Sequence, residues 1–221
     1  MEISENLSLL HRCIPPHVQV IAVSKTQDQE AIMEAYAAGH RSFGENKVQE
    51  LTTKALALPS DIHWHFIGHL QTNKVRSIVP FIHLIHSIDT FKLLQEVEKE
   101  AGKINRVIPC LLQFHIATEE TKFGLDLGEA FEILESPVYK AMKHILIKGL
   151  MGMATYTDDE DLIRQEFRKL RDGFIRIKAR FFTLDNEFSV LSMGMSGDYK
   201  LAIEEGSTMV RIGTAIFGER T

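Results

Sequence analysis

Short apolar runs alternate with helical segments along this 221-residue chain, and the alternation occurs eight times. The runs have little polar alternation, which is typical of strands buried on both faces of a parallel sheet. Eight such units in this length predict an α/β fold, a single (β/α)8 TIM-type barrel with a short extra N-terminal helix, rather than a doubly wound sheet. We expect one domain over residues 1–221. The predicted strands are residues 18–25, 41–43, 63–67, 82–86, 107–116, 145–151, 190–193 and 209–212.

Several helix starts can be predicted from the sequence. A helix is expected to start near Asp28, after the first strand, and to end at Gly39. Asp126 and Glu129 have the spacing of a capping box, in which the first side chain and the one three residues later satisfy each other's backbone N–H groups. Thr157 and Glu160 repeat that spacing and predict the start of the longest helix.

The bulk properties exclude several classes of protein. A net charge of −5 argues against affinity driven by a nucleic-acid backbone. No apolar stretch approaches the roughly 20 residues needed to cross a bilayer, and the acidic first residues do not resemble a signal peptide. Cys13 and Cys110 are isolated thiols without metal or redox spacing, which fits a reducing compartment. We therefore expect a cytoplasmic protein without nucleic-acid or membrane partners.

Two basic residues follow or interrupt apolar strands. Lys25 closes the first strand, and Arg211 lies between Val210 and Ile212 in the last one. Active sites of barrels are built at the carboxyl ends of the strands, so Lys25 is a candidate functional residue, although a solvated loop lysine is the simpler explanation. An arginine inside an apolar strand needs an acceptor, which loop polarity does not explain.

The turns after the last two strands are rich in small residues. Ser196 follows the seventh strand between Gly194 and Gly197, and Gly213 and Thr214 follow the eighth. Barrels frequently bind a phosphate here through backbone N–H groups, because small residues let the backbone approach the anion. The glycines alone are weak evidence, since they also suit ordinary turns.

Ten histidines suggest a metal site as an alternative. His63 and His65 share a face of one strand, and a His-x-His pair can hold a divalent ion. A metal site needs further ligands nearby, and the sequence has none with convincing spacing. Core or surface histidines explain most of them better.

Together these stretches resemble the pyridoxal phosphate (PLP) homeostasis proteins, single-barrel relatives of the N-terminal domain of alanine racemase. The resemblance covers residues 18–218, nearly the whole chain. Its most specific segments are residues 22–26, 43–46, 64–74, 86–89, 122–124, 191–198 and 206–218.

The resemblance implies a PLP-binding barrel with the cofactor attached to Lys25 as a Schiff base. It implies that Arg211 faces the pyridine nitrogen, Asn46 lines the pocket near the ring, and Met193 packs against it. The phosphate would be held by Ser196, Gly213 and Thr214. The chain departs from the family pattern at His115, where Asn is more usual, and at Thr155-Tyr156-Thr157, where the family often has proline.

The chemistry of these residues favours binding over turnover. An arginine stays protonated, so Arg211 can donate to the pyridine nitrogen but cannot protonate it, and an unprotonated ring is a weak electron sink. In the racemases a second base comes from a C-terminal β-domain, whereas this sequence ends at Thr221. We expect a monomeric PLP binder acting in vitamin B6 and amino-acid balance, with apo PLP-dependent enzymes as partners. The alternatives are a racemase-like PLP enzyme and a metal-dependent hydrolase using His63 and His65.

Overall fold

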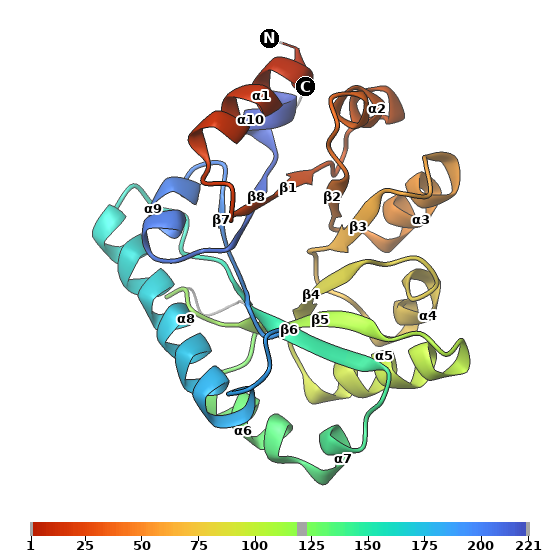
Figure 1. Cartoon of the computed structure of the whole chain (residues 1–221), viewed down its shortest axis with the longest axis vertical. Coiled ribbons are helices and arrows are strands. Elements are labelled where there is room, and N and C mark those ends of the chain that lie inside the picture. The colour runs from red at the N-terminus through yellow and green to blue at the C-terminus, as the bar shows by residue number, and fades with distance from the viewer. Residues whose placement is uncertain (1, 119–122, 220–221) are drawn as a thin grey trace.

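A computed structural model describes residues 2–118 and 123–219 of the chain. Within these residues, parallel strands β1 to β8 pair in chain order and close into a barrel, which confirms the predicted fold (Figure 1). Closure comes from the pairing of β8 with β1, in which Gln19 lies opposite Met209 and Ala22 opposite Ile212. The strands are β1 Gln19–Val23, β2 Ser42–Glu45, β3 His63–Phe66, β4 Leu84–Ile88, β5 Ile108–Phe114, β6 Ile145–Gly152, β7 Val190–Met195 and β8 Met209–Ile212.

Helices surround the barrel on its outer side. The predicted helix start near Asp28 and the predicted capping box at Asp126 are confirmed: Asp28 accepts from the Ala31 N–H at 2.8 Å, and Asp126 forms a complete capping box with Glu129. The helices are α1 Ile3–Cys13, α2 Gln29–Ala37, α3 Val48–Ala57, the 3₁₀ turn η1 Thr72–Lys74, α4 Val75–Ile78, α5 Phe91–Lys103, α6 Leu127–Glu135, α7 Pro137–Lys140, α8 Glu160–Phe181, α9 Tyr199–Glu204 and α10 Thr214–Phe217.

The predicted cap of the longest helix was wrong. Helix α8 is capped by Asp159, whose carboxylate accepts from the Leu162 N–H at 3.1 Å. Thr157 instead accepts a hydrogen bond from the N–H of Asp159. Asp159 competes successfully for the capping position because aspartate is at least as good an N-cap as threonine.

Several strand ends differ from the predicted ones because neighbouring strands set the register. Strand β1 stops at Val23, and β2 continues to Glu45, which lies opposite Phe66 of β3. Strand β4 runs to Ile88, which lies opposite Leu112 of β5. The pattern of apolar residues locates a strand, but the ladder to its neighbours decides where the strand ends.

The buried side chains form two layers. A small cluster from five strands fills the barrel interior, and its members are Ile21, Leu84, Leu111, Met151 and Met209. A much larger cluster fills the space between barrel and helices and includes Trp64, the single tryptophan of the sequence, whose ring centroid lies 6.0 Å from that of Phe43.

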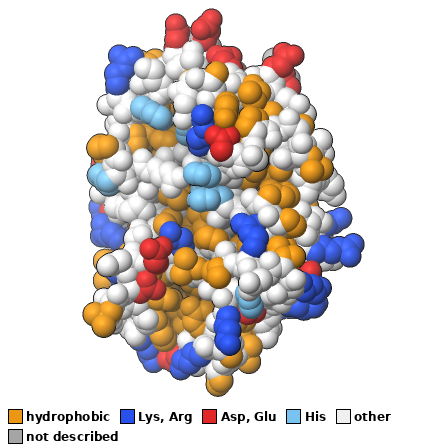
Figure 2. Space-filling view, turned by 45° about the vertical axis from the view of Figure 1, so that its right-hand side comes forward, with side chains coloured by type: hydrophobic (Ala, Val, Ile, Leu, Met, Phe, Trp, Pro, Cys, Tyr) orange, Lys and Arg blue, Asp and Glu red, His pale blue; other side chains and the backbone are white. Residues whose placement is uncertain are grey.

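The two ends of the described chain lie side by side (Figure 1). Helix α1 packs against α10, and the Asn6 side chain donates to the Ile216 carbonyl at 2.9 Å. On the face drawn in Figure 2, Lys and Arg side chains are scattered among acidic and uncharged ones rather than gathered in one field. Among the described residues, no helix is both long and apolar enough to cross a membrane.

Candidate functional site

Four adjacent strands bring the predicted site residues to one end of the barrel. Strands β7, β8, β1 and β2 are consecutive neighbours around the ring, and residues just after their carboxyl ends line the mouth. Lys25 comes two residues after β1, and Asn46 comes directly after β2. Both side chains are half-buried at this rim. The topology therefore places an amine and an amide at the same edge, as parallel strands require.

Arg211 lies deeper, inside the barrel and almost fully buried at 3% exposure. Its Cα partner on β1 is Ile21, a member of the interior cluster. Its Nη1 donates to the Ser192 carbonyl at 2.9 Å and to the Ser192 hydroxyl at 2.7 Å, and its Nη2 donates to the Gly152 carbonyl at 3.0 Å. Burial lowers the pKa of Arg211 to about 10, so the guanidinium remains charged at neutral pH.

A neutral hydrogen-bond chain continues from Arg211 across the barrel. His86 Nδ1 lies 3.1 Å from the Ser192 hydroxyl, and His86 Nε2 lies 2.9 Å from His65 Nδ1. Burial lowers the pKa values of both histidines well below the ordinary range, so both are neutral at pH 7. We call His65, His86, Ser192 and Arg211 the inner chain.

Arg211 gives the inner chain a direction. A guanidinium can only donate, so the Ser192 oxygen accepts from it and has its own proton to donate to His86 Nδ1. His86 then carries its proton on Nε2 and donates to His65 Nδ1. His65 Nε2 is left with the last proton, and this buried atom has no partner among the described residues. The sequence did not reveal this chain, because its members come from four distant strands.

The predicted phosphate-binding turns meet beside Arg211. The Gly213 N–H donates to the Ser196 hydroxyl at 3.1 Å, which joins the turn after β7 to the turn after β8. Thr214 is exposed and is the first residue of α10, whose opening N–H groups lack intrahelical acceptors. A hydroxyl and backbone N–H groups around a half-buried turn suit an anion.

Met193 does not join this group. Its side chain is fully buried and belongs to the large cluster between barrel and helices. It follows Ser192, whose hydroxyl points into the barrel, and adjacent residues on a strand face opposite sides. The placement of Met193 therefore gives no support to the expected contact with a ring at the mouth.

The segments that depart from the family pattern follow the carboxyl ends of β5 and β6. Thr155 is held by the buried Glu166 of α8, which accepts from the Thr155 N–H at 2.6 Å and from its hydroxyl at 2.7 Å. The Tyr156 side chain is almost completely exposed. His115 is half-buried after β5. Lys122, part of another family segment, lies outside the described residues.

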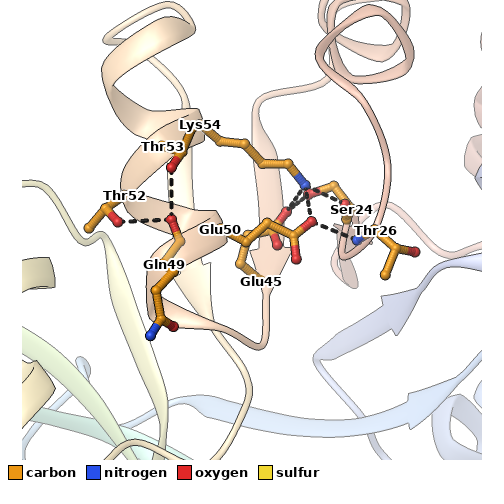
Figure 3. A network of polar contacts seen from close by, with 8 residues as sticks. All are labelled: Ser24, Thr26, Glu45, Gln49, Glu50, Thr52, Thr53 and Lys54. Carbon is orange, nitrogen blue, oxygen red and sulfur yellow. Dashed lines mark hydrogen bonds and ion pairs between the residues drawn. The ribbon is translucent and has the colours of Figure 1, made fainter.

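A charged cluster lies behind Lys25, between β1, β2 and α3 (Figure 3). Lys54 Nζ contacts Glu45 at 2.9 Å, Glu50 at 2.6 Å and the Ser24 carbonyl at 2.8 Å. The Ser24 hydroxyl donates to Glu45 at 2.6 Å. Burial raises the pKa of Glu45, against the opposing effect of Lys54 and Ser24. We call Ser24, Glu45, Glu50 and Lys54 the outer cluster.

Sequence reasoning missed Glu50 and Lys54. The signal was present, because Lys54 continues the buried stripe of Val48 and Leu51 along α3. A lysine on the apolar side of a helix needs a buried acceptor.

The metal-site alternative is not supported by the geometry. His63 is exposed at the start of β3 and stacks on His83 with ring centroids 4.3 Å apart, whereas His65 is buried and bonded to His86. Within residues 2–118 and 123–219, no three His, Cys, Asp or Glu side chains are grouped so that they could hold a metal ion.

Comparisons with known proteins agree with this geometry. A family model described as "Alanine racemase, N-terminal domain" matches residues 1–221. The chain is 41% identical over 207 residues to a "Pyridoxal phosphate homeostasis protein" of Aquifex aeolicus, covering 91% of this chain and 87% of that protein. The chain belongs to this family. A member of the family from Helicobacter pylori, with the same name, is 41% identical over 204 residues, 91% of this chain and 88% of its own length.

Solved structures of the family have the same barrel. PipY of Synechococcus elongatus, in the structure described as with PLP bound, has a TM-score of 0.87 and 37% identity, covering 98% of this chain and all of that one. Alanine racemase from Bartonella henselae has a TM-score of 0.73 at 18% identity and matches over 58% of its length, so it supports the fold alone.

Proposed function

We propose that this protein binds PLP covalently through Lys25 and serves PLP homeostasis as a single-domain barrel without efficient turnover. The observation that carries the proposal is the convergence of an amine, a buried guanidinium, and a hydroxyl with backbone N–H groups on four adjacent strands. PLP supplies an aldehyde that condenses with an amine, a pyridine ring and a phosphate. The names of the relatives and the PLP-bound PipY structure support the same assignment.

Each group of the site has a proposed role. Lys25 forms the Schiff base, Arg211 donates to the pyridine nitrogen, and Asn46 lines the pocket near the ring. Ser196 and the turn of Gly213 and Thr214 hold the phosphate. In the structure the Gly213 N–H is used by Ser196. Ser196 can still donate its own proton to an anion.

The inner chain supports the proposal that the protein turns over poorly. Arg211 remains charged, and every other member of the chain is neutral. A group that only donates cannot protonate the pyridine nitrogen, so the ring gains little ability to stabilise a carbanion. We propose that the protein is a cytoplasmic, monomeric carrier or regulator, with apo PLP-dependent enzymes as acceptors.

The covalent attachment is tested by borohydride reduction of the protein mixed with PLP. Peptide mapping by mass spectrometry should place the pyridoxyl group on Lys25, and Lys25→Ala should lose both the adduct and the yellow colour. Lys74→Ala is the matched control, because Lys74 is another half-buried lysine after a strand, in η1. An adduct found mainly on Lys74 or Lys122 would contradict the proposal.

The absence of efficient turnover is tested with L-alanine in deuterated water and excess PLP. We expect slow exchange at Cα and no D-alanine, since loss of one positioned acid or base typically costs about 10² to 10⁴ in rate. Sustained D-alanine formation, well above that of free PLP and abolished by Lys25→Ala, would show that the protein is an enzyme.

A further inference from the structure

The turn that carries Lys25 has an unusual backbone. The Gln27 N–H donates to the Ser24 carbonyl at 3.0 Å and closes a four-residue turn with Lys25 and Thr26 at its centre. Thr26 has a φ of 67°, in the left-handed region. At this position of such a turn glycine is the usual residue, and a β-branched side chain is strained there. The surrounding structure must therefore hold the turn in place.

The outer cluster holds both sides of this turn. Lys54 Nζ donates to the Ser24 carbonyl at 2.8 Å, the same oxygen that closes the turn. The Thr26 N–H donates to Glu50 Oε1 at 2.6 Å. These are charge-assisted bonds, which are stronger than bonds between neutral groups. Lys25 is thus flanked by two residues whose backbone is bonded to charged side chains of one helix, α3.

The outer cluster acts from behind the barrel wall. Figure 3 shows the Lys54 side chain extending from α3 to the turn after β1, with Glu50 beside it. The Lys54 side chain is 7% exposed and that of Glu50 is 23% exposed. Glu50 and Lys54 reach Lys25 through the backbone of residues 24 and 26, which lie on either side of it, and Lys54 also bonds to Glu45 of β2.

We propose that Glu50 and Lys54 are positioning residues that hold the strained Thr26 turn and thereby aim the Lys25 amine into the mouth of the barrel. The proposal rests on the proposed role of Lys25 in binding PLP. It differs from a purely structural role, because it predicts that the need for Glu50 disappears when the strain at Thr26 is removed.

The experiment compares Glu50→Ala, Thr26→Gly and the double variant. Two quantities are measured: the rate at which Lys25 captures PLP, by borohydride quenching and peptide mapping, and the hydrogen exchange, without PLP, of the Gln27 amide, which closes the turn onto the Ser24 carbonyl. Glu50→Ala should speed exchange and slow capture, each about tenfold, as expected for loss of one charge-assisted bond. Glycine adopts positive φ without strain, so the double variant should recover to within about threefold of Thr26→Gly.

Gln49→Ala is the matched control on the same helix, because the Gln49 side chain is exposed. It should change neither quantity. A Glu50→Ala protein that melts at a lower temperature yet captures PLP at the wild-type rate would overturn the proposal, and so would a double variant as slow as Glu50→Ala. A wild-type protein that captured no PLP on Lys25 would refute the proposed function alone, since the amide exchange and its suppression by Thr26→Gly are measured without PLP.

Discussion

Lys25 and Arg211, the two basic residues of the predicted site, are held in opposite ways. The backbone around Lys25 is fixed from outside the barrel by charged side chains of β2 and α3. The Arg211 side chain is fixed from inside by two carbonyls and the Ser192 hydroxyl, which is itself bonded to the neutral imidazole of His86. The outer cluster fixes the main chain on either side of Lys25. The inner chain fixes the side chain itself.

The difference has a physical reason. A carboxylate inside the barrel would pair with Arg211 and compete with any ligand for it. Neutral acceptors form the direct hydrogen bonds to the guanidinium, and the half-buried Asp198 carboxyl acts on it only electrostatically. Outside the barrel wall, opposite charges can neutralise each other because nothing there has to bind a ligand. Removing one charged side chain of the outer cluster therefore leaves another charge unpaired. Removing one side chain of the inner chain costs only the hydrogen bond that it makes.

The largest expected effect comes from removing the central cation of the outer cluster. Lys54→Met leaves Glu45 fully buried with an unpaired charge, and one oxygen of Glu45 already lacks a partner among the described residues. Breaking a buried ion pair from one side typically costs about 3–5 kcal/mol in the free energy of unfolding. Urea denaturation measures this loss. Lys99→Met, which removes an exposed lysine of α5, is the control and should cause no measurable loss.

A double variant tests whether the unpaired charge of Glu45 causes the loss of stability in Lys54→Met. Adding Glu45→Leu to Lys54→Met removes the unpaired charge, so the double variant should recover a large part of the lost stability. Equal stability of Lys54→Met and the wild type would show that the charges of the outer cluster do not depend on one another for stability.

Removing the hydroxyl of the inner chain should have a smaller effect. Ser192→Ala leaves His86 Nδ1 without its donor, whereas Arg211 keeps the Ser192 and Gly152 carbonyls. We expect a loss of about 1–3 kcal/mol in unfolding free energy, the usual cost of one unsatisfied buried group. Ser189→Ala, an exposed serine beside the start of the same strand, should be neutral. A loss as large as that of Lys54→Met would contradict the proposed difference between the two regions.

The two regions should also respond to pH with opposite signs. His65 and His86 stay neutral in the folded protein but bind protons near pH 6.5 when unfolded, so stability falls as the pH drops below that value. Each contributes up to about 1.4 kcal/mol per pH unit. Glu45 has a raised pKa, so its contribution falls as the pH rises above its ordinary value of 4.5.

The pH response is measured by urea unfolding between pH 5 and pH 7.5. His86→Gln should reduce the slope in the acidic range by about one proton's contribution, roughly 1.4 kcal/mol per pH unit. His17→Gln removes an exposed histidine and should leave the slope unchanged. A slope that His86→Gln does not alter would show that the inner chain already takes up a proton when folded.

The smallest expected effect is at Ser196, which belongs to neither region. Ser196→Ala should weaken the binding of PLP by about 0.5–1.5 kcal/mol, the usual net value of a hydrogen bond. The free energy of unfolding should fall by no more than this amount, because only the half-buried Gly213 N–H loses its acceptor. Pyridoxal lacks the phosphate, so its binding should change less. Isothermal titration with both ligands makes the comparison, and equal weakening of both would contradict the assignment of Ser196 to the phosphate.

The sequence predicts the parts of this molecule that depend on local pattern. The apolar runs located the strands, and the rule that parallel strands share an edge brought Lys25, Asn46 and Ser196 to one mouth. The outer cluster depends on how α3 packs behind β1, which no spacing within one segment encodes. The expected contact of Met193 with the ring gains no support from the structure for a similar reason, since the face that a strand residue presents changes with its register.

Trp64 lies in the barrel wall on β3, separated from Lys25 by a single strand, and is the only tryptophan of the sequence. A chromophore at the mouth whose absorption overlaps the emission of indole quenches that fluorescence by resonance energy transfer. The fluorescence of Trp64 should thus report whether a chromophore is bound at the mouth. Binding and release of PLP at the mouth should therefore be measurable in real time without an added dye, including while a second protein competes for PLP.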